Sequence, residues 1–230
     1  MSELDYKKIY SIAGCIAGPL DKTKSFLEEA PNLSDWKNRP LKIELQHSFG
    51  TDVLLENDAV LAGIGEAVYG AGKGCNITAY ITIGTGVGGA RIVNSKLDSN
   101  SLGFEPGHQI IVPDGSPCSC GGKGHLEAYI SGSSLEGTFN QDAADIQDPD
   151  IWSVVTRYLA IGLNNTLVYW SPDVIVLGGA VSKSIPLDKL QTELRSLVTI
   201  FNSLPEVKKA ILADKAGLYG ALEYLKQNRK

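Results

Sequence analysis

Apolar positions along the chain follow two different periods, and each period predicts one type of element. Short apolar runs bounded by turn residues predict strands, whereas apolar residues that recur about every 3.6 positions predict helices. The predicted strands are residues 8–16, 53–55, 77–83, 90–93, 174–177 and 208–212. The predicted helices are residues 40–50, 59–68, 151–170, 187–198 and 217–227. Because strands and helices alternate and several parallel crossovers are possible, the pattern predicts an α/β protein.

The composition is that of an ordinary globular protein. The chain has 230 residues, enough for one large domain or two small lobes, and 43% of them are apolar and 20% charged. The formal net charge is −5, and the lysines and arginines are scattered along the chain. Because binding to a nucleic-acid backbone needs a clustered basic surface, we expect no direct nucleic-acid partner.

Cysteine use and the first residues bear on the cellular compartment. No apolar run is long enough to cross a bilayer, and the start MSELDYKK lacks the apolar segment of a secretory signal. We therefore expect a cytoplasmic protein with no membrane partner. Cys15 and Cys75 are far apart in the sequence, whereas Cys118 and Cys120 share one short loop. In a reducing compartment this arrangement favours metal binding over disulfides.

Residues 103–127 contain two of the three histidines and two of the four cysteines. These four side chains follow the pattern H-x9-C-x-C-x4-H; they are His108, Cys118, Cys120 and His125. Two thiolates and two imidazoles are the ligand set of a closed, tetrahedral, structural zinc site. The alternative, a loop without metal, leaves the clustering unexplained. Zinc alone does not account for Glu105 and Glu127, which flank the ligands.

The glycine run GTGVGG at residues 84–89 matches the pattern G-x-G-x-x-G. A dinucleotide-binding fingerprint needs a helix directly after the glycines, but residues 90–97 continue as β-branched residues and a turn. The segment therefore predicts a glycine-rich hairpin. Such a hairpin is either an ordinary turn or a place where bare backbone amides contact phosphate. Four glycines around Thr85 exceed what a turn needs, and we favour the phosphate interpretation.

Asn57 and Asp58 stand at a predicted strand-to-helix junction. Asn and Asp are preferred helix N-caps, and from these residues alone a capping role is the favoured interpretation. The alternative is that Asp58 is a general base for a substrate hydroxyl, with Asn57 orienting the same substrate.

Five segments together resemble the ROK family of bacterial sugar kinases and sugar-responsive repressors. They are ENDA at 56–59, TIGTGVGGARIV at 82–93, GFEPGH at 103–108, CSCGGKGHLE at 118–127 and VIVLGGAVS at 174–182. The resemblance runs from about Tyr10 to the last predicted helix. It implies the two-lobed, ribonuclease H-like fold of the actin, hexokinase and Hsp70 ATPase class. Residues 1–58 would form a small lobe, to which residues 216–230 return, and residues 59–215 a large lobe with the zinc loop.

The resemblance also implies an activity, the ATP-dependent phosphorylation of a hexose, as in glucokinases. Asp58 would accept the proton of the attacking hydroxyl, most often the 6-OH, with Mg²⁺ bound to ATP. Residues that would bind the sugar are Asn57, Glu105, His108, Glu127, Gly18 and Asn32. Residues that would contact ATP are Gly84, Thr85, Gly86, Gly88, Gly178 and Gly179. The zinc would then act as a clamp that holds Glu105, His108 and Glu127 around the hexose.

Two departures from the family pattern change these expectations. His125 stands where the family has a cysteine, and we expect a zinc site with two histidines and two cysteines. The D-x-G-G-T phosphate loop that opens family members occurs nowhere in the chain, so we expect an incomplete small lobe. The alternative function is therefore a catalytically silent sugar-binding or regulatory protein. A homodimer is possible on the family resemblance.

Overall fold

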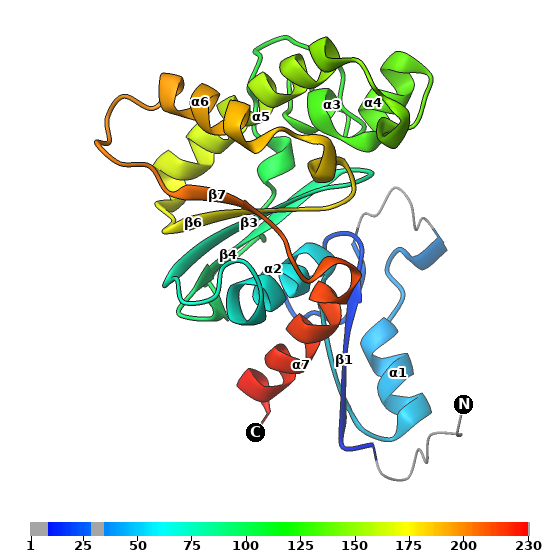
Figure 1. The fold of residues 1–230 in the computed structure, drawn as a ribbon. Helices are drawn as coiled ribbons and strands as arrows, with labels where there is room; N and C mark the ends of the chain where they lie inside the picture. The colour runs from blue at the N-terminus through cyan, green and yellow to red at the C-terminus, as the bar shows by residue number, and fades with distance from the viewer. Residues whose placement is uncertain (1–8, 29–34, 230) are drawn as a thin grey trace.

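The computed structural model describes residues 9–28 and 35–229 of the 230-residue chain, and these form two β-sheets with helices around them (Figure 1). The smaller sheet pairs β1 (Ser11–Ile16) with β2 (Asp52–Asn57) in parallel. The larger sheet has the strand order β5-β4-β3-β6-β7. Its strands are β3 (Ile77–Ile83), β4 (Val87–Val93), β5 (Lys96–Leu97), β6 (Val174–Gly178) and β7 (Glu206–Lys209).

Strand β3 lies at the centre of the larger sheet and determines its mixed topology. It pairs antiparallel with β4 and parallel with β6, and β6 pairs parallel with β7. The hairpin predicted from the glycine run is thus confirmed. β4 begins at Val87 and not at residue 90, because Gly88 and Gly89 take part in the ladder opposite Thr82 and Ile81.

The predicted last strand was displaced from the observed one. β7 covers residues 206–209, where Val207 is buried. The apolar residues that suggested a strand at 208–212 lie mostly after it, and Ile211 is 67% exposed. The prediction was wrong because it assumed that these apolar residues are buried in a strand, whereas Ile211 lies in solvent after β7. The first predicted strand begins in residues outside the described range; β1 itself starts at Ser11.

Seven helices are described. They are α1 (Leu41–Phe49), α2 (Asp58–Tyr69), α3 (Glu127–Ile130), α4 (Gly132–Phe139), α5 (Pro149–Trp170), α6 (Leu187–Leu197) and α7 (Ala216–Asn228). Four 3₁₀ turns are also described: η3 (Pro106–His108), η4 (Ala143–Asp145), η5 (Val181–Ser184) and η6 (Ala213–Lys215). α5 starts at a proline after the N-cap Asp148, whose side chain accepts from the amide of Asp150, as expected for a helix start.

Helices cover both faces of the larger sheet (Figure 1). On one face the helical stripe of α5, with Leu159 and Leu163 fully buried, packs with α6 against Ile81 and Ile175. On the other face α2 packs on β3 and β4, where Ile92 joins its buried side chains. The alternation of β3 residues between these two layers explains why the strand is apolar along nearly its whole length.

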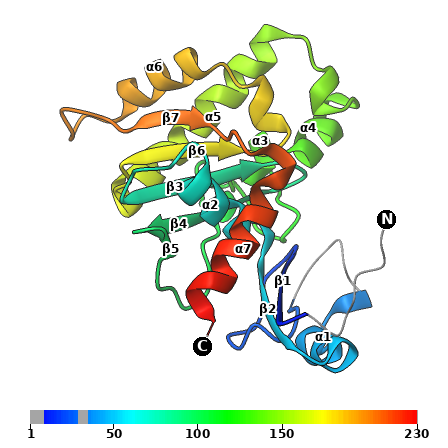
Figure 2. The same cartoon turned by 60° about the horizontal axis from the view of Figure 1, so that its bottom comes forward.

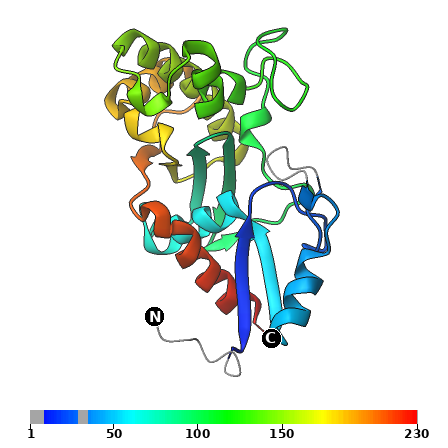
Figure 3. The same ribbon diagram turned by 90° about the vertical axis from the view of Figure 1, so that its right-hand side faces the viewer.

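The smaller sheet, together with α1, lies to one side of the larger sheet (Figure 2). α7, near the end of the described chain, packs on α2 and also on β1 of the smaller sheet (Figure 3). Glycines permit this close crossing: a Cβ atom at Gly65 would clash with the carbonyl of Ala216, and one at Gly220 with the carbonyl of Leu61. The division into lobes at residues 1–58 and 59–215 stays a prediction. Among the described helices, none is long and apolar enough to cross a membrane.

Candidate active site and metal cluster

Asn57 caps α2 and also ties the helix to the segment after β1. Its Oδ1 accepts hydrogen bonds from the amides of Ala59 at 3.0 Å and Val60 at 3.3 Å. Its Nδ2 donates to the carbonyl oxygen of Gly18 at 3.2 Å. Gly18 has a φ of 108°, a conformation that favours glycine. The capping role expected from the sequence is therefore real, and two predicted sugar-binding residues are in direct contact.

Asp58 is the first residue of α2 and is exposed to solvent. Its Oδ1 accepts from the amide of Ala59 at 2.9 Å. Desolvation raises the pKa of this carboxyl above its usual value of 3.8, although the hydrogen bond from Ala59 opposes the rise. A carboxylate that water can reach, but that protein atoms crowd, has the character expected of a general base.

Glu105 lies just before the turn η3, and two other carboxylates affect its pKa. Desolvation raises its pKa, and the charges of Glu127 and Asp58 raise it further, while His108 lowers it. Such interactions act only over short distances. Glu105 is therefore within electrostatic reach of Glu127, at the start of α3, and of Asp58, at the start of α2.

Glu127, the first residue of α3, links the glycine hairpin to the cysteine loop. Its Oε2 accepts from the amide of Val87 at 2.8 Å, and its Oε1 accepts from the hydroxyl of Ser119 at 3.2 Å. A Cβ atom at Gly86 would lie 2.7 Å from Oε2. Glycine at position 86 therefore leaves room for the carboxylate of Glu127.

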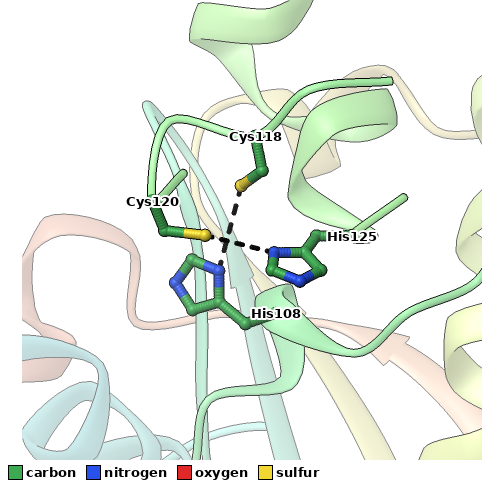
Figure 4. Close-up of side chains that lie close together, drawn as sticks. All are labelled: His108, Cys118, Cys120 and His125. Atoms are coloured by element: carbon green, nitrogen blue, oxygen red, sulfur yellow. Dashed lines mark hydrogen bonds between the residues drawn. The ribbon is translucent and has the colours of Figure 1, made fainter. Parts of the chain in front are cut away.

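The two histidines and two cysteines predicted to bind metal do come together (Figure 4). One ligand atom from each, from His108, Cys118, Cys120 and His125, lies within 4.8 Å of all the others. The Sγ of Cys118 is 3.9 Å from Nδ1 of His108, and the Sγ of Cys120 is 3.2 Å from Nδ1 of His125. Ligands around a tetrahedral zinc are separated by about 3.3–3.8 Å, given the usual Zn–N and Zn–S bond lengths. The donor set fits zinc, and the two distances lie just outside this range, one above it and one below.

Glycines shape the loop that carries the two thiols. The amide of Cys118 donates to the carbonyl of Gly122 and the amide of Gly121 donates to the carbonyl of Cys118, both at 2.9 Å. Gly121 and Gly124 have φ values of 89° and 69°, which other residues rarely adopt. The loop thereby folds back and brings Cys120 to His125. Nδ1 of His108 faces the cluster, so its Nε2 is left for another partner.

The glycine turn between β3 and β4 is fixed by hydrogen bonds from the start of α4. The carbonyl of Gly84 accepts from the amide of Gly132 at 2.7 Å, and the carbonyl of Thr85 accepts from the amide and hydroxyl of Ser133. Within the described part of the chain, the amides of Thr85 and Gly86 donate to no other group. Gly88 lies apart from this turn: it belongs to β4, and a Cβ there would be 3.2 Å from the Cβ of Ala59.

β6 ends at Gly178, which pairs with Thr82 in the parallel ladder, so Gly178 and the following Gly179 lie beside the same turn. A side chain at Gly179, whose φ is 83°, would clash with the carbonyl of Ile83. The carboxyl ends of adjacent parallel strands are where open α/β sheets bind ligands. All residues predicted to contact the nucleotide, except Gly88, therefore lie at the carboxyl ends of β3 and β6.

Sequence reasoning missed two charged side chains near these segments. Lys209 donates from Nζ to the carbonyls of Ser182 and, at 2.8 Å, Ile185, which holds the turn η5 after Gly179. Burial lowers the pKa of Lys209 to about 8. Glu56, next to Asn57, is buried. No sequence period marks either residue, since each acts on groups distant in the chain. Asn32 lies outside the described residues.

The ROK family model matches residues 2–228. The chain belongs to the ROK family. A glucokinase of Streptomyces coelicolor is 31% identical to this ROK protein over 249 residues, which cover 92% of this chain and 78% of the glucokinase. A xylose repressor of Bacillus spizizenii is 32% identical over 208 residues, which cover 83% of this chain and 54% of the repressor.

A solved ROK structure shows the same arrangement of elements. It is a ROK family glucokinase from Streptomyces griseus in complex with glucose and AMPPNP, with a TM-score of 0.79 and 31% identity. The superposition covers 92% of this chain and 80% of that one. This ROK protein therefore has the actin-like ATPase fold, and the fold class and family predicted from the sequence are confirmed.

Proposed function

We propose that this ROK protein transfers the γ-phosphoryl group of ATP to a hexose, in the manner of a glucokinase. The observation that carries the proposal is that the starts of α2 and α3 both lie against the glycine hairpin: a Cβ atom at Gly88 would be 3.2 Å from Ala59, next to Asp58, and one at Gly86 would be 2.7 Å from Oε2 of Glu127. The charges of Asp58 and Glu127 also raise the pKa of Glu105. These groups lie beside the glycine turn, because Glu127 also binds the amide of Val87. A relative named as a glucokinase and a glucokinase structure with glucose and AMPPNP support the same activity.

In this proposal Asp58 is the general base. One of its oxygens accepts the amide of Ala59, and the other takes the proton of the hexose 6-hydroxyl. The sugar oxygen then bonds to the γ-phosphorus as the bond from that phosphorus to the β–γ bridging oxygen breaks, which releases ADP. Mg²⁺ bound with ATP would neutralise phosphate charge. The raised pKa of Asp58 suits a group that must accept a proton.

The remaining hydroxyls of the hexose would bind to side chains around Asp58. Glu105 and Glu127 would accept hydrogen bonds, and His108 would use Nε2, since its Nδ1 faces the cluster. Asn57 has one amide hydrogen left after its bond to Gly18. Gly18 and Asn32 complete the proposed sugar-binding set.

ATP would bind along the edge of the larger sheet formed by the two glycine segments. The free amides of Thr85 and Gly86, with Gly84, would contact phosphate oxygens. Gly178 and Gly179 would lie beside adenosine; their missing side chains leave room for Tyr80 and for the backbone of Ile83, which pack against them. Gly88 supports this surface by its close packing on α2, without direct contact with the nucleotide.

Zinc, held by His108, Cys118, Cys120 and His125, would have a structural role. Its chemistry here is to fix four side chains in a closed set with no position for a reacting group. The bond between Glu127 and Ser119, which lies between the two cysteines, extends this rigidity to the proposed sugar site. The metal would thus hold His108 and Glu127 in place.

A second candidate is a catalytically silent sugar-binding or regulatory protein. The relative named as a xylose repressor favours it. It predicts hexose binding without phosphoryl transfer.

Hexose-dependent ADP formation by the 230-residue protein, with Mg-ATP and a panel of hexoses, tests the two candidates. We expect ADP to form with at least one hexose, and not in its absence. Calorimetry on the same sample measures hexose binding. Binding of a hexose without any ADP formation would reject the kinase and support the silent sugar-binding protein.

A further inference from the structure

Glu56 is a buried charged side chain on the face of β2 opposite to that of Val53 and Leu55. It occupies β2 directly before Asn57, and only 1% of its surface is exposed. Two other residues of the strand, Val53 and Leu55, are apolar and buried. Burial of a carboxylate is unfavourable unless partners compensate for the lost water.

Three segments supply those partners. Oε1 of Glu56 accepts from Nζ of Lys24 at 2.8 Å and from the amide of Asn57 at 2.9 Å. Oε2 accepts from the hydroxyl of Tyr224 on α7 at 3.4 Å. Glu56 therefore joins the loop after β1, the junction between β2 and α2, and α7.

The contacts of Glu56 close a ring around the proposed catalytic junction. Asn57 is bonded to Glu56 through its backbone amide and to Gly18 through its side chain. Lys24 follows Gly18 in a turn that Asp21 stabilises by accepting from the amides of Ser25 and Phe26, both at 2.7 Å. The loop is thus tied to the junction twice, once at Gly18 and once at Lys24.

The pair of Lys24 and Glu56 is a poor candidate for stability alone. The side chain of Lys24 is 36% exposed while that of Glu56 is buried. Water around the ammonium group therefore weakens the attraction between the two charges, and the pair contributes little to the free energy of folding. Replacement of a buried ion pair by apolar residues is often neutral or stabilising. What an apolar residue could not do is hold the amide of Asn57 and the loop in one fixed geometry.

We propose that Glu56, held by Lys24 and bonded directly to the amide of Asn57, positions Asn57 and Asp58 for the reaction. The inference rests on the proposed kinase function. Glu56 is a positioning residue, because it reaches the substrate only through its neighbours. Desolvation and the charge of Glu56 raise the pKa of Tyr224 to about 12, so its hydroxyl stays a donor throughout the working pH range.

Two variants and two controls test this assignment. Glu56→Gln keeps the shape of the side chain but removes its charge, and Lys24→Met removes the cation but keeps a long side chain at a half-exposed position. Lys24→Arg restores the cation. Glu44→Gln, in an ion pair with Arg39 on the surface of α1, is the matched control for loss of one ion pair.

The first readout is hydrogen exchange of the amides of Ala59 and Val60, which Asn57 caps. We expect Glu56→Gln and Lys24→Met to accelerate their exchange at least tenfold, with no change at Ile81 in the larger sheet. A purely structural role would accelerate all of these amides together. Lys24→Arg and Glu44→Gln should behave as the unmodified protein.

The second readout is turnover. We expect kcat to fall by about ten- to a hundredfold in Glu56→Gln and Lys24→Met, with a smaller change in the hexose KM, because small misplacements of reacting groups cost this much. Unchanged exchange at Ala59 and Val60 in both variants overturns the positioning role, whatever the activity. Accelerated exchange in a protein that never forms ADP rejects the kinase function and retains the role of Glu56 in fixing Asn57.

Discussion

Asn57 and Asp58 divide the work at the start of α2. The sequence favoured a capping role for the pair, and the structure gives that role to Asn57, whose side chain accepts two helix amides. Oδ1 of Asp58 accepts from the amide of Ala59, and within the described residues no other residue donates to its Oδ2. A residue that looked like part of a cap is thus left free for chemistry.

Asp58→Asn should separate activity from stability. Asparagine can still accept the amide of Ala59 but cannot take a proton, so kcat should fall by about 10²–10⁴, the usual contribution of a general base. Hexose affinity, measured by calorimetry, should change little. Preserved turnover in this variant would remove Asp58 from the role of base.

The same variant has a pH-dependent effect on folding, because the pKa of Asp58 is raised in the folded protein. At pH values below the pKa of Asp58 in the unfolded chain, the carboxyl is protonated in both the folded and the unfolded state. As the pH rises, the unfolded chain releases this proton before the folded protein does, so the folded protein becomes less stable relative to the unfolded chain until the pH exceeds the folded pKa. Asp58→Asn lacks that loss. We expect its free energy of unfolding in urea to exceed that of the unmodified protein near pH 7, and the difference to shrink toward pH 3. In the unmodified protein, kcat should fall over the same acidic range.

Glu56 and Lys209 show where residue-level reading fails. Both are charged side chains in strands, and their partners are 32 and 27 positions away in the chain. Sequence periodicity reports which face of a strand is buried, not which distant carbonyl or ammonium group meets it. The free amides of Thr85 and Gly86, by contrast, could be expected, because a glycine-rich turn is recognised from consecutive residues in the sequence.

Among the elements, the cysteine loop is the one most fully predictable from sequence. Its four proposed ligands lie between residues 108 and 125, and glycines with positive φ fold the segment back on itself. Ligand type, spacing and turn residues are all written in one short stretch. The strands were harder: β4 and β7 both start earlier than predicted, since ladder pairing and not apolar content decides where a strand begins.

Removal of one thiol should test the loop as a metal clamp. Cys120 is exposed, so Cys120→Ser leaves no buried hole and changes mainly the ligand set. We expect metal content, measured by elemental analysis, to fall from one zinc per chain, and hexose binding to weaken at least tenfold. Cys75→Ser, a thiol outside the cluster, is the control and should retain both. Normal hexose binding by metal-free Cys120→Ser protein would refute the clamp.

At the scale of the whole molecule, the crossing of α2 and α7 connects the two sheets. α2 packs under the larger sheet and α7 packs on both α2 and β1. Gly65 and Gly220 let the two helices approach so closely that either residue's missing side chain would meet backbone atoms of the other helix. Glycine in a helix usually lowers its stability, so the sequence alone gave no reason to expect a packing role at these positions.

Two glycines of α7 make a matched pair for a test of this crossing. In Gly220→Ala the new methyl group would clash with the carbonyl of Leu61, and we expect a loss of about 1–3 kcal/mol, as for other overpacked sites. In Gly217→Ala the nearest atom to the methyl group is the Sγ of Cys15 at 4.0 Å, so the higher helix propensity of alanine should dominate and stabilise the protein slightly. Urea unfolding measures both. Equal effects of the two substitutions would contradict a tight crossing.

The cysteine loop, residues 108–125, also has a consequence for the order of events during folding. Its ligands are neighbours in the chain, whereas β3 must wait for β6, whose paired residues Thr82 and Gly178 are far apart in sequence. Short-range contacts form faster than long-range ones, because less chain entropy is lost in closing them. A metal ion captured while the chain is still emerging would therefore assemble His108 and the start of α3 first and offer a ready-made surface to the later strands. Zinc supply during synthesis, more than zinc concentration afterwards, would then govern how much functional protein a cell obtains.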